Sequence, residues 1–392
     1  MQPLRLALIG NLCDNAIIFA NLLRADDLKP SIYMSSAELR ACTLPAMQPV
    51  KGANFSEHIK KIQEANSNIY IWDYAPKLNW LMYLPVLGKI IYRTLTLIRF
   101  LWQLQKVDII LSFAMYHIVS LLSTKPYIAL STGADLHEVA VEKSIKGWLM
   151  KHAFKRAQSV RASFDPISKN HAIHLRLGHI EPFLIPWPVP DKPPASSHSE
   201  GPIRVFMPSR QDWCDPKRAL LSKRNDLFIR AWARRVREGW DSVLTIVEHG
   251  EDLEATRSLV NDLGVADLVQ FVPILDQASL QRQIENADLV ADQFDQGTPG
   301  ALALQALASG RALSIYWDEF SSAHVFSQVA PVINGNSEEQ LFEQLQRFAQ
   351  RAHLRELGLQ GHAWIKREYN RERLRRQLRW SIALACGITL SE

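Results

Sequence analysis

The chain is poor in cysteine, with only four in 392 residues: Cys13, Cys42, Cys214 and Cys386. They lie far apart without paired spacing, which excludes a disulfide framework and a cysteine-based zinc site and indicates a reducing compartment. Internal repeats and low-complexity tracts are also missing. The first apolar run, Leu4–Ile9, is too short for a signal peptide and leads directly into a turn, so we expect a buried strand there.

The sequence also lacks an uninterrupted apolar run of membrane-spanning length. Its most apolar segment, residues 78–102, is interrupted by Pro85, Gly88, Lys89, Arg93 and Arg99. One interpretation places this segment in a membrane interface, with Trp80, Tyr83 and Trp102 at head-group depth. A second basic amphipathic stretch, residues 143–156, would then also be attracted to anionic lipid. The alternative is two core-facing helices with solvated basic faces, and the sequence leaves both interpretations open.

The composition is that of a globular protein, with 47% hydrophobic and 22% charged residues, and it excludes disorder. Positive charge is concentrated in residues 1–190, where 21 Lys and Arg outnumber 13 Asp and Glu and give a net charge of +8. The remaining residues have a net charge of −3. The basic first half favours an anionic partner or surface. Nucleic acid is disfavoured, because long aliphatic runs separate the cations and no recognition motif is present.

Short apolar runs alternate with longer amphipathic runs in both halves of the chain. This alternation predicts an α/β protein with two Rossmann-like parallel-sheet domains that face a central cleft. Proline-rich residues 188–202 predict a linker between a first domain over 1–187 and a second over 203–365. Strands are expected at 4–9, 107–112, 127–130, 203–207, 242–247, 268–272 and 289–291. Helices are expected at 16–24, 118–123, 144–156, 226–237, 253–263 and 280–286, and after Gly300.

Polar residues and glycines follow the predicted strands of the second domain. Arg210 and Lys223 are expected at the carboxyl edge of the sheet, where an arginine fork and a lysine point charge suit a diphosphate. Glu248 ends the next strand. Gly297 and Gly300 permit a tight turn before a short helix, whose N-terminus favours an anion. For each feature alone, the alternative is a solvated surface charge or an ordinary βαβ connection.

Taken in order, these pieces resemble the donor-binding domain of retaining glycosyltransferases of family 4, which have the type B fold. The pieces are Pro208-Ser-Arg210, Lys223-Arg-Asn-Asp226, Glu248-His-Gly250, and the run from Asp292 through Gly297-Thr-Pro-Gly300 to Gln305-Ala-Leu-Ala-Ser-Gly310. In the first domain, the residues after the first strand and the Ser131–Asp135 segment agree with the same family. The resemblance covers residues 5–370.

The resemblance implies a role for each matching position. Arg210 and Lys223 would bind the donor diphosphate and act in catalysis. The implied donor site comprises Arg210, Lys223, Glu248, Asp295, Gly297, Thr298, Pro299, Gly300 and Gln305. The implied acceptor site comprises Gly10, Asn11, Asn15 and Asp135. In this fold the final segment, here 366–392, is a helix that is expected to cross back to the first domain.

Three positions depart from the family pattern. The family places two glutamates across the turn, and the matching positions here are Gly297 and Gln305. Glutamine has one acceptor oxygen, so it would hold ribose hydroxyls less strongly than a carboxylate, while glycine offers no side chain at all. Asp295 is the expected substitute for the first glutamate. Arg224 stands where the family commonly has glycine after the lysine.

A transferase of this type depends mainly on electrostatic neutralisation of the leaving diphosphate. No Asp-X-Asp pair stands at a strand end, so we expect no metal and no cofactor, with Arg210, Lys223 and the helix N-terminus in the metal's place. On the first domain, Asp135 is expected to orient or deprotonate an acceptor hydroxyl, and His117 is a second candidate base. The alternatives are a helix cap for Asp135 and a structural role for His117.

Together with these features, the resemblance implies a metal-independent retaining hexosyltransferase acting in surface polysaccharide or glycolipid biosynthesis. It would move a sugar from a UDP- or GDP-linked donor to a carbohydrate or lipid-linked acceptor. We expect it in the cytoplasm, peripheral at the inner face of the cell membrane and in contact with anionic lipid. The alternative is a non-catalytic, transferase-like scaffold or regulatory subunit that has lost the usual glutamates. A nucleotide-sugar epimerase of the same architecture is disfavoured, because the predicted cleft lacks a convincing set of carboxylates.

Overall fold

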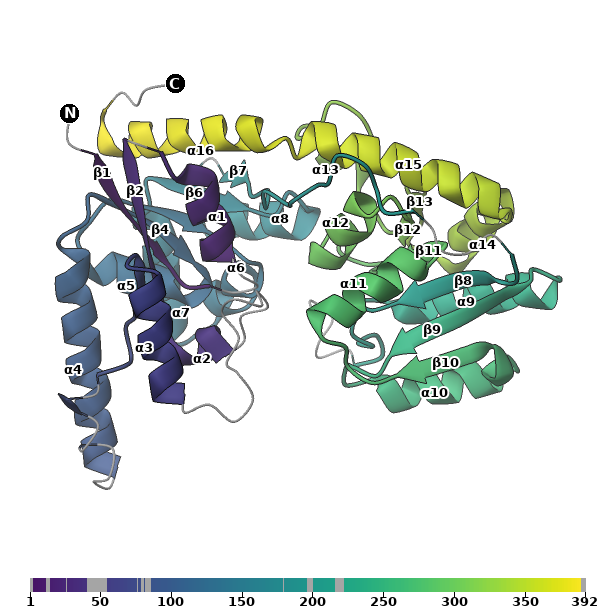
Figure 1. Ribbon diagram of the computed structural model, residues 1–392, viewed down its shortest axis with the longest axis horizontal. Helices are drawn as coiled ribbons and strands as arrows, with labels where there is room; N and C mark the ends of the chain where they lie inside the picture. The colour runs from purple at the N-terminus through teal and green to yellow at the C-terminus, as the bar shows by residue number, and fades with distance from the viewer. Residues whose placement is uncertain are drawn as a thin grey trace. The chain divides into compact units, whose positions relative to one another are not determined.

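A computed structural model describes residues 3–11, 15–25, 27–40, 55–75, 77–78, 81, 86–178, 180–195, 200–215 and 222–388. The chain folds into two compact units (Figure 1). Unit 1 comprises Met1–Ser163, Ser168–Pro186 and Arg371–Glu392, and unit 2 comprises Phe164–Ile167 and Trp187–Asn370. Two parallel-sheet α/β domains, as the sequence predicts, are therefore present.

Unit 1 is built on a seven-stranded, all-parallel sheet with the order β3-β2-β1-β4-β5-β6-β7. Its strands are continuous buried runs at the centre and short segments at the edges, because central parallel strands are covered on both faces. The strands are β1 (Leu4–Ile9), β2 (Leu28–Met34), β3 (Ile69–Ile71), β4 (Ile109–Phe113), β5 (Tyr127–Leu130), β6 (Ser159–Ala162) and β7 (Ile180–Pro182).

Helices cover both faces of this sheet. On one face, α1 packs beside α16, with Phe19 of α1 against Phe113 of β4. On the other face, Phe100 of α4 and Met150 of α7 join one core cluster with Ile110 of β4. The helices of this unit are α1 (Asn15–Leu23), α2 (Ser36–Arg40), α3 (Phe55–Ala65), α4 (Val86–Leu104), α5 (His117–Leu122), α6 (Ala134–His137), α7 (Ile145–Arg156), α8 (Pro166–His174) and α16 (Arg371–Cys386), with 3-10 turns η4 (Ala114–Tyr116) and η5 (Val139–Val141).

The last helix, α16, is fixed to unit 1 by ionic and polar contacts. The guanidinium of Arg379 pairs with Asp27, which lies just before β2. Ser381 accepts a hydrogen bond of 2.7 Å from Arg161 of β6, and Arg161 also pairs with Glu181. The chain therefore returns to the first sheet after completing unit 2.

Unit 2 contains a six-stranded parallel sheet with the order β10-β9-β8-β11-β12-β13. Its apolar strands alternate along the chain with amphipathic helices, and these helices connect the parallel strands and cover the sheet. The strands are β8 (Ile203–Met207), β9 (Ser242–Val247), β10 (Val269–Val272), β11 (Leu289–Ala291), β12 (Ala312–Ile315) and β13 (Ile333–Asn334).

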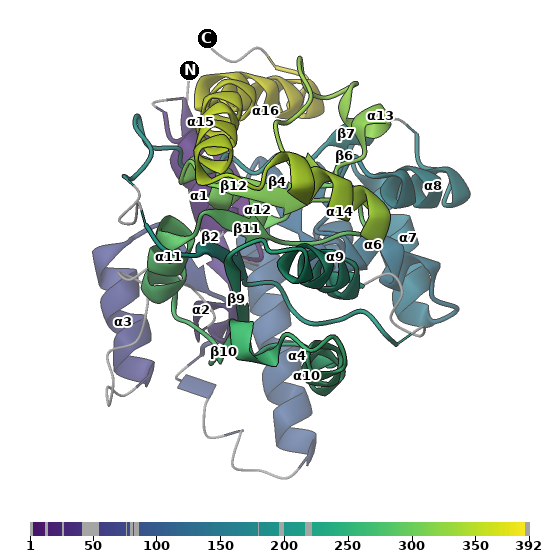
Figure 2. The same ribbon diagram turned by 90° about the vertical axis from the view of Figure 1, so that its right-hand side faces the viewer.

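Helices also cover both faces of the second sheet (Figure 2). Phe228 and Trp232 of α9 are buried against Leu341 and Phe342 of α14, whereas α12 packs beside α11 and α15. The helices are α9 (Asn225–Arg237), α10 (Leu253–Asp262), α11 (Gln277–Asn286), α12 (Ala301–Ala308), α13 (Glu319–Ser322), α14 (Glu338–Arg347) and α15 (Arg351–Glu368), with the 3-10 turn η7 (Ala266–Leu268).

Candidate functional site

The order of the strands places the candidate donor residues together in unit 2. β8 and β11 are neighbours at the centre of the sheet, and the chain leaves them toward opposite edges. Ligands of doubly wound sheets bind beyond the carboxyl ends of such a strand pair. Arg210 follows β8, and the turn that contains Gly297–Gly300 follows β11. The predicted cation and the predicted glycine turn therefore share one edge of the sheet.

Lys223 is held at this edge by three hydrogen bonds. Its backbone N–H donates to the carbonyl of Asp212 at 2.6 Å, and its own carbonyl accepts from Phe294 at 2.8 Å. Its ammonium group donates to the side-chain oxygen of Gln293. Burial lowers the pKa of Lys223, and the nearby carboxylate of Asp292 partly offsets this effect. The lysine is thus a positioned cation that lacks full solvation.

Arg210 stands close enough to Lys223 to act on its charge. Its guanidinium pairs with the carboxylate of Asp212 at 2.9 Å and is about one-third exposed, at 35%. The positive charge of Arg210 further lowers the pKa of Lys223. Two cations in one partly buried place repel each other, and the carboxylates of Asp292 and Asp212 offset part of this repulsion, so a bound anion would offset it further.

Gln293, which was not anticipated from the sequence, connects Lys223 to the glycine turn. Its side chain is buried, accepts from the ammonium of Lys223 and donates at 2.5 Å to the carbonyl of Thr298. Its backbone carbonyl accepts from Tyr316 at 2.9 Å, which fixes its orientation. The signal that could have found it is its position, two residues after β11 at the carboxyl edge of the sheet.

The start of α12 already has an acidic side chain of the protein beside it. Asp292 is buried and accepts from the backbone N–H of Ala303, while burial raises the pKa of its carboxyl group. Gly300 is the residue before the helix, and no side chain caps it there. Asp292 therefore uses one backbone N–H of the first helical turn, which is then not available to a ligand. A bound phosphate would be held mainly by Arg210 and Lys223 and less by the helix N-terminus.

Gly297 occupies a backbone conformation that explains why no glutamate stands there. Its φ angle is +76°, in the left-handed region, and its carbonyl accepts from Asp318 at 2.8 Å. A Cβ atom at this position would lie 2.8 Å from the Cβ of Asp318. The missing carboxylate therefore reflects the path of the loop, which excludes a side chain at 297.

Replacing Gly297 with alanine should reduce the free energy of unfolding by about 3 kcal/mol, the sum of left-handed strain and a steric clash. Gly264 is the matched control, because its φ angle is +68° and no atom lies within 4 Å of its missing Cβ. Gly264→Ala should cost only about 1 kcal/mol. Urea denaturation measures both values, and equal losses would show that the contact with Asp318 is not restrictive.

Arg224 replaces the glycine of the family pattern and still adopts the left-handed conformation, with φ of 48°. Its guanidinium pairs with Asp226 at 3.0 Å in the first turn of α9. This ion pair offsets part of the backbone strain at Arg224. It also directs the guanidinium charge of Arg224 to the carboxylate of Asp226 at the start of α9.

Gln305 lies on α12 and is engaged by the neighbouring helix α11. Its amide group donates at 2.7 Å to the side-chain oxygen of Gln281, whose own amide donates to Glu285 at 2.6 Å and to Ser309 at 3.0 Å. Gln305 is buried. The contact between α11 and α12 therefore uses the side-chain NH₂ group of Gln305, a hydrogen-bond donor that a glutamate would lack.

The remaining donor-side residues have different surroundings. Glu248 follows β9 and pairs with Arg257 of α10, whose guanidinium lies 4.1 Å from the ring centroid of Phe271. Asp295 is exposed and lies near the charges of Arg224 and Lys223. Thr298 is buried, and Pro299 is partly exposed in the same turn. The structure thus gathers Arg210, Lys223 and residues 295–300, while Glu248 and Gln305 have partners on adjacent helices.

Three of the four predicted acceptor residues, Gly10, Asn11 and Asn15, lie between the end of β1 and the start of α1, next to the point where the chain order reverses between β1 and β4. The fourth, Asp135, follows β5 and lies on α6. Gly10 has φ of +89°, and a Cβ there would lie 2.6 Å from the ring of Tyr116. The N–H of Asn11 donates to Glu38 at 2.7 Å, and its side-chain oxygen accepts from Ile17 at 3.3 Å. Asn11 and Asn15 are both buried, so they shape this turn from within.

Glu38 and Tyr116 were not anticipated from the sequence, although they organise this turn. The hydroxyl of Tyr116 donates to Glu38 at 2.6 Å and accepts from the indole of Trp72 at 3.2 Å. Burial, followed by the Glu38 charge, raises the pKa of Tyr116. The two residues are 78 positions apart, so only the fold reveals their contact.

His117 and Asp135 form a buried pair. A distance of 2.9 Å joins the Nε2 atom of His117 to the carboxylate of Asp135, and both side chains are inaccessible, at 0% and 1% exposure. The Nδ1 atom of His117 contacts the hydroxyl of Ser112, while Asp135 accepts from Ser131 and from the N–H of Thr132, both at 3.0 Å. Gly133, not Asp135, is the N-cap of α6. The pair thus ties together the ends of β4 and β5.

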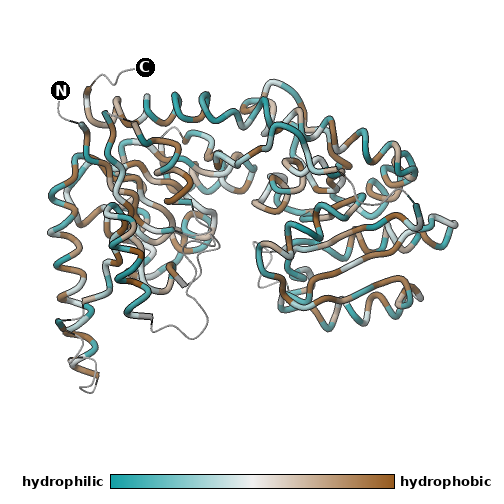
Figure 3. Tube along the Cα trace, in the orientation of Figure 1, coloured by the Kyte–Doolittle hydropathy of each residue, from teal (hydrophilic) through white to brown (hydrophobic). Residues whose placement is uncertain are grey.

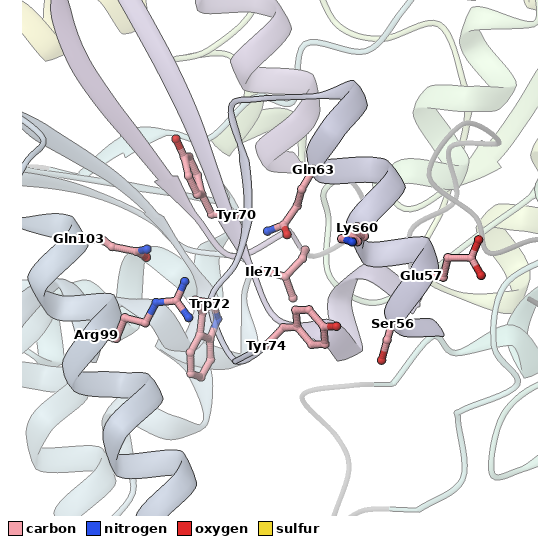
Figure 4. Close-up of a pocket in the computed structure, with 10 residues that line it drawn as sticks. All are labelled: Ser56, Glu57, Lys60, Gln63, Tyr70, Ile71, Trp72, Tyr74, Arg99 and Gln103. Carbon is pink, nitrogen blue, oxygen red and sulfur yellow. The ribbon is translucent and has the colours of Figure 1, made fainter. Parts of the chain in front are cut away.

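A cavity of about 600 Å³ lies beside the edge strand β3 (Figure 4). Gln63 and Lys60 of α3 line one side of it, and Arg99 and Gln103 of α4 line the other. Among the described residues, its lining includes none of the predicted site residues. Trp72 in its wall connects it to the turn after β1 through the hydrogen bond to Tyr116.

The described part of the chain offers neither a metal-binding cluster nor a membrane span. Three or more His, Cys, Asp or Glu side chains are nowhere grouped there in a way that would hold a metal ion. None of its helices is both long and apolar enough to cross a bilayer.

Comparisons with known proteins identify the fold. No protein-family model matches the chain, and no curated protein matches its sequence. The chain is structurally similar to TarM from S. aureus, solved with fondaparinux, α-GlcNAc-glycerol and UDP (TM-score 0.56, 14% identity). That match covers 74% of this chain, which spans only 59% of TarM.

Two other solved structures match over nearly their full lengths. HepE from Anabaena, in complex with UDP, has a TM-score of 0.59 and 12% identity, covering 97% of this chain and 100% of HepE. The lipopolysaccharide outer core galactosyltransferase WaaB has a TM-score of 0.59 and 11% identity, covering 97% of this chain and 99% of WaaB. The two parallel-sheet units are thus those of the glycosyltransferase type B fold.

Proposed function

We propose that the protein is a retaining hexosyltransferase that moves a sugar from a UDP- or GDP-linked donor to a carbohydrate or lipid-linked acceptor, in surface polysaccharide or glycolipid biosynthesis. The observation that carries the proposal is the placement of Arg210 and Lys223 beside the glycine turn after β11. The similar structures support it, since HepE was solved with UDP and with UDP-glucose, and WaaB is a galactosyltransferase.

In this proposal the donor diphosphate binds between Arg210 and Lys223. The arginine offers a planar fork of donors and the lysine a point charge, which together neutralise the negative charge that develops as the sugar leaves. These cations take the part that a divalent metal would otherwise play, so the proposed reaction needs neither metal nor cofactor. Gln293 positions the lysine by accepting from its ammonium group.

The acceptor side belongs to unit 1 in the same proposal. The turn at Gly10 and Asn11 would contact the acceptor through its backbone, because its side chains face inward. His117 and Asp135 are buried, so we assign them the positioning of the strand-end segments at Ser112 and Ser131. The reaction would take place at the inner face of the cell membrane, with the protein in peripheral contact with anionic lipid.

A direct test is incubation of the protein with UDP and GDP sugars and a panel of glycan and lipid-linked acceptors. We expect acceptor-dependent release of the nucleoside diphosphate from at least one donor, and NMR of the product should show the same anomeric configuration as the donor. An inverted product would contradict retention alone. Absence of release with every donor and acceptor would contradict transferase activity.

A non-catalytic scaffold or regulatory subunit is the second candidate, and the loop at Gly297 favours it because no carboxylate fits there. Gln305→Glu separates the two functions. In an active enzyme this change should weaken the contact with Gln281 and alter turnover modestly. A variant that gains donor affinity while the unmodified protein stays inactive would support the scaffold.

As pH rises, donor binding should begin to weaken at a lower pH than it would if Lys223 had the usual pKa of a lysine. Burial holds the pKa of Lys223 below its usual value of 10.5, and only the protonated form attracts the diphosphate, so affinity falls as pH rises through that lowered pKa. Lys223→Arg should retain affinity to higher pH, whereas Lys366→Arg, at an exposed pair with Asp191, should leave the profile unchanged. Calorimetric titration across pH measures the shift, and an identical alkaline loss in Lys223→Arg would assign it to another group.

A further inference from the structure

Helix α4 has a mainly apolar outward face, which Thr94 interrupts and exposed cations border. Val86, Ile90, Ile98 and Trp102 recur at intervals of four or eight residues, and they include side chains exposed at 73% (Val86), 57% (Ile98) and 61% (Trp102). Leu87, Ile91 and Leu95 extend this face along one flank and are also exposed. Apolar residues recur along the whole helix (Figure 3). We call these seven residues the α4 face.

The α4 face does not pack into the core of unit 1, because the opposite side of the helix is the side that packs there. Gly88, Tyr92, Thr96, Phe100 and Leu104 are the buried residues of α4, and they also follow a four-residue interval. Phe100 and Leu104 belong to the main core cluster of unit 1. The helix is thus apolar on two opposite sides, of which only one has a partner in the described residues.

The charged residues within helix α4 and directly after it are all positive. Residues 86–106 contain four cations, Lys89, Arg93, Arg99 and Lys106, and no aspartate or glutamate. The ammonium group of Lys106 lies 3.9 Å from the ring centroid of Trp102, so a cation borders the face at its C-terminal end. Lys89 and Arg93 are exposed at its N-terminal end.

A second helix on the same side of the sheet repeats the pattern. Met150 and Phe154 of α7 join the core cluster that contains Phe100 of α4, so both helices cover one face of the sheet. Outward from α7 stand Ile145, exposed at 81%, and Trp148. Residues 143–156 carry five cations and no acidic residue. This layer of unit 1 therefore presents exposed apolar side chains next to cations.

We propose that the α4 face, assisted by the outward side of α7, binds the surface of a bilayer that contains anionic phospholipid. Exposed aliphatic residues would enter the acyl boundary, Trp102 and Trp148 would lie at head-group depth, and the cations would meet lipid phosphates. A neutral protein surface would leave these cations without counter-charges, so charge complementarity selects an anionic lipid surface. The inference extends the membrane contact of the proposed function, and it does not depend on sugar transfer. Trp80 and Tyr83, expected at the same depth, lie outside the described residues.

Vesicle flotation of the full-length protein tests the proposal without any nucleotide sugar. We expect binding to vesicles of phosphatidylcholine with phosphatidylglycerol, little binding to phosphatidylcholine alone, and weakening by salt. Ile98→Glu should reduce the vesicle-bound fraction by about tenfold. Leu359→Glu is the matched control, because Leu359 is an exposed aliphatic residue of α15 in unit 2, at 51%, and its replacement should leave binding unchanged. Lys89→Gln combined with Arg93→Gln should reduce binding to the anionic vesicles only.

Several results would overturn the proposal. One is that the unmodified protein does not bind vesicles. Another is that Ile98→Glu and the unmodified protein bind vesicles equally. A third is a dimer in sedimentation velocity that Ile98→Glu converts to a monomer, since that would make a second copy of the chain the occupant. Donor titration of Ile98→Glu is measured in parallel, so loss of vesicle binding with intact donor affinity separates the membrane surface from the donor site.

Discussion

Lys223→Ala is expected to reduce turnover by about a hundredfold to a thousandfold, the usual effect of removing a group that stabilises charge in a transition state. Burial lowers the pKa of Lys223, and Gln293 fixes its ammonium group beside the glycine turn. Arg210→Ala should have a similar effect, because the diphosphate would lose the fork of the pair. Acceptor-dependent release of nucleoside diphosphate provides the measurement.

Arg282→Ala is the matched control for these two variants. Arg282 is a cation of unit 2 on α11, where its guanidinium donates to the hydroxyl of Ser279 one turn away, and we expect unchanged turnover. The variants at 210 and 223 should unfold cooperatively in urea like the unmodified protein. If either turns over at the unmodified rate, the diphosphate is bound elsewhere.

Asp135→Ala should reduce the free energy of unfolding by about 3 kcal/mol, because it leaves the buried Nε2 atom of His117 without its partner, while Nδ1 keeps its contact with Ser112. It also removes the acceptor for Ser131 and for the N–H of Thr132, so three contacts at the end of β5 are lost together. Denaturation by urea, followed by far-ultraviolet circular dichroism, measures the loss.

A surface pair in the same unit provides the comparison for Asp135→Ala. Glu57 pairs with Lys61 one turn away at 3.0 Å, and both side chains are largely exposed. Glu57→Ala should therefore change the stability by no more than about 0.5 kcal/mol. If Asp135→Ala were equally mild, the buried pair would not be the connection between β4 and β5 that its geometry suggests.

The sequence predicted the central strands better than the edge strands. β1, β5, β8, β9 and β11 have the predicted bounds, because a strand covered on both faces is a continuous apolar run bounded by turn residues. Edge strand β7 spans only three residues and ends in Pro182, which is tolerated where no further strand needs its N–H. Such a segment has no distinctive pattern.

The side-chain connections of the site could not be predicted in the same way. Lys223 and Gln293 are 70 positions apart, and Gln305 meets Gln281 from the adjacent helix. Spacing along the chain places residues at a sheet edge, but it does not specify which side chains bond there. The same limit explains the candidate bases, since neither the burial of His117 nor its pairing with Asp135 follows from sequence position.

Membership of family 4, retention and the site roles stay predictions, whereas the type B fold is confirmed. The absence of the first family glutamate now has a structural reason at 297, where φ of +76° and Asp318 exclude a side chain. At 305 the amide is used by Gln281. A donor site in this chain would rely on Arg210 and Lys223 more heavily than the family pattern does.

Calorimetric titration of the unmodified protein and Lys223→Ala with UDP and GDP sugars tests the central claim most directly. We predict that at least one nucleotide sugar binds the unmodified protein with one site per chain, and that Lys223→Ala weakens this binding by at least about tenfold. Absence of binding to every nucleotide sugar, or equal affinity in the two proteins, would contradict a donor site at the carboxyl edge of the second sheet.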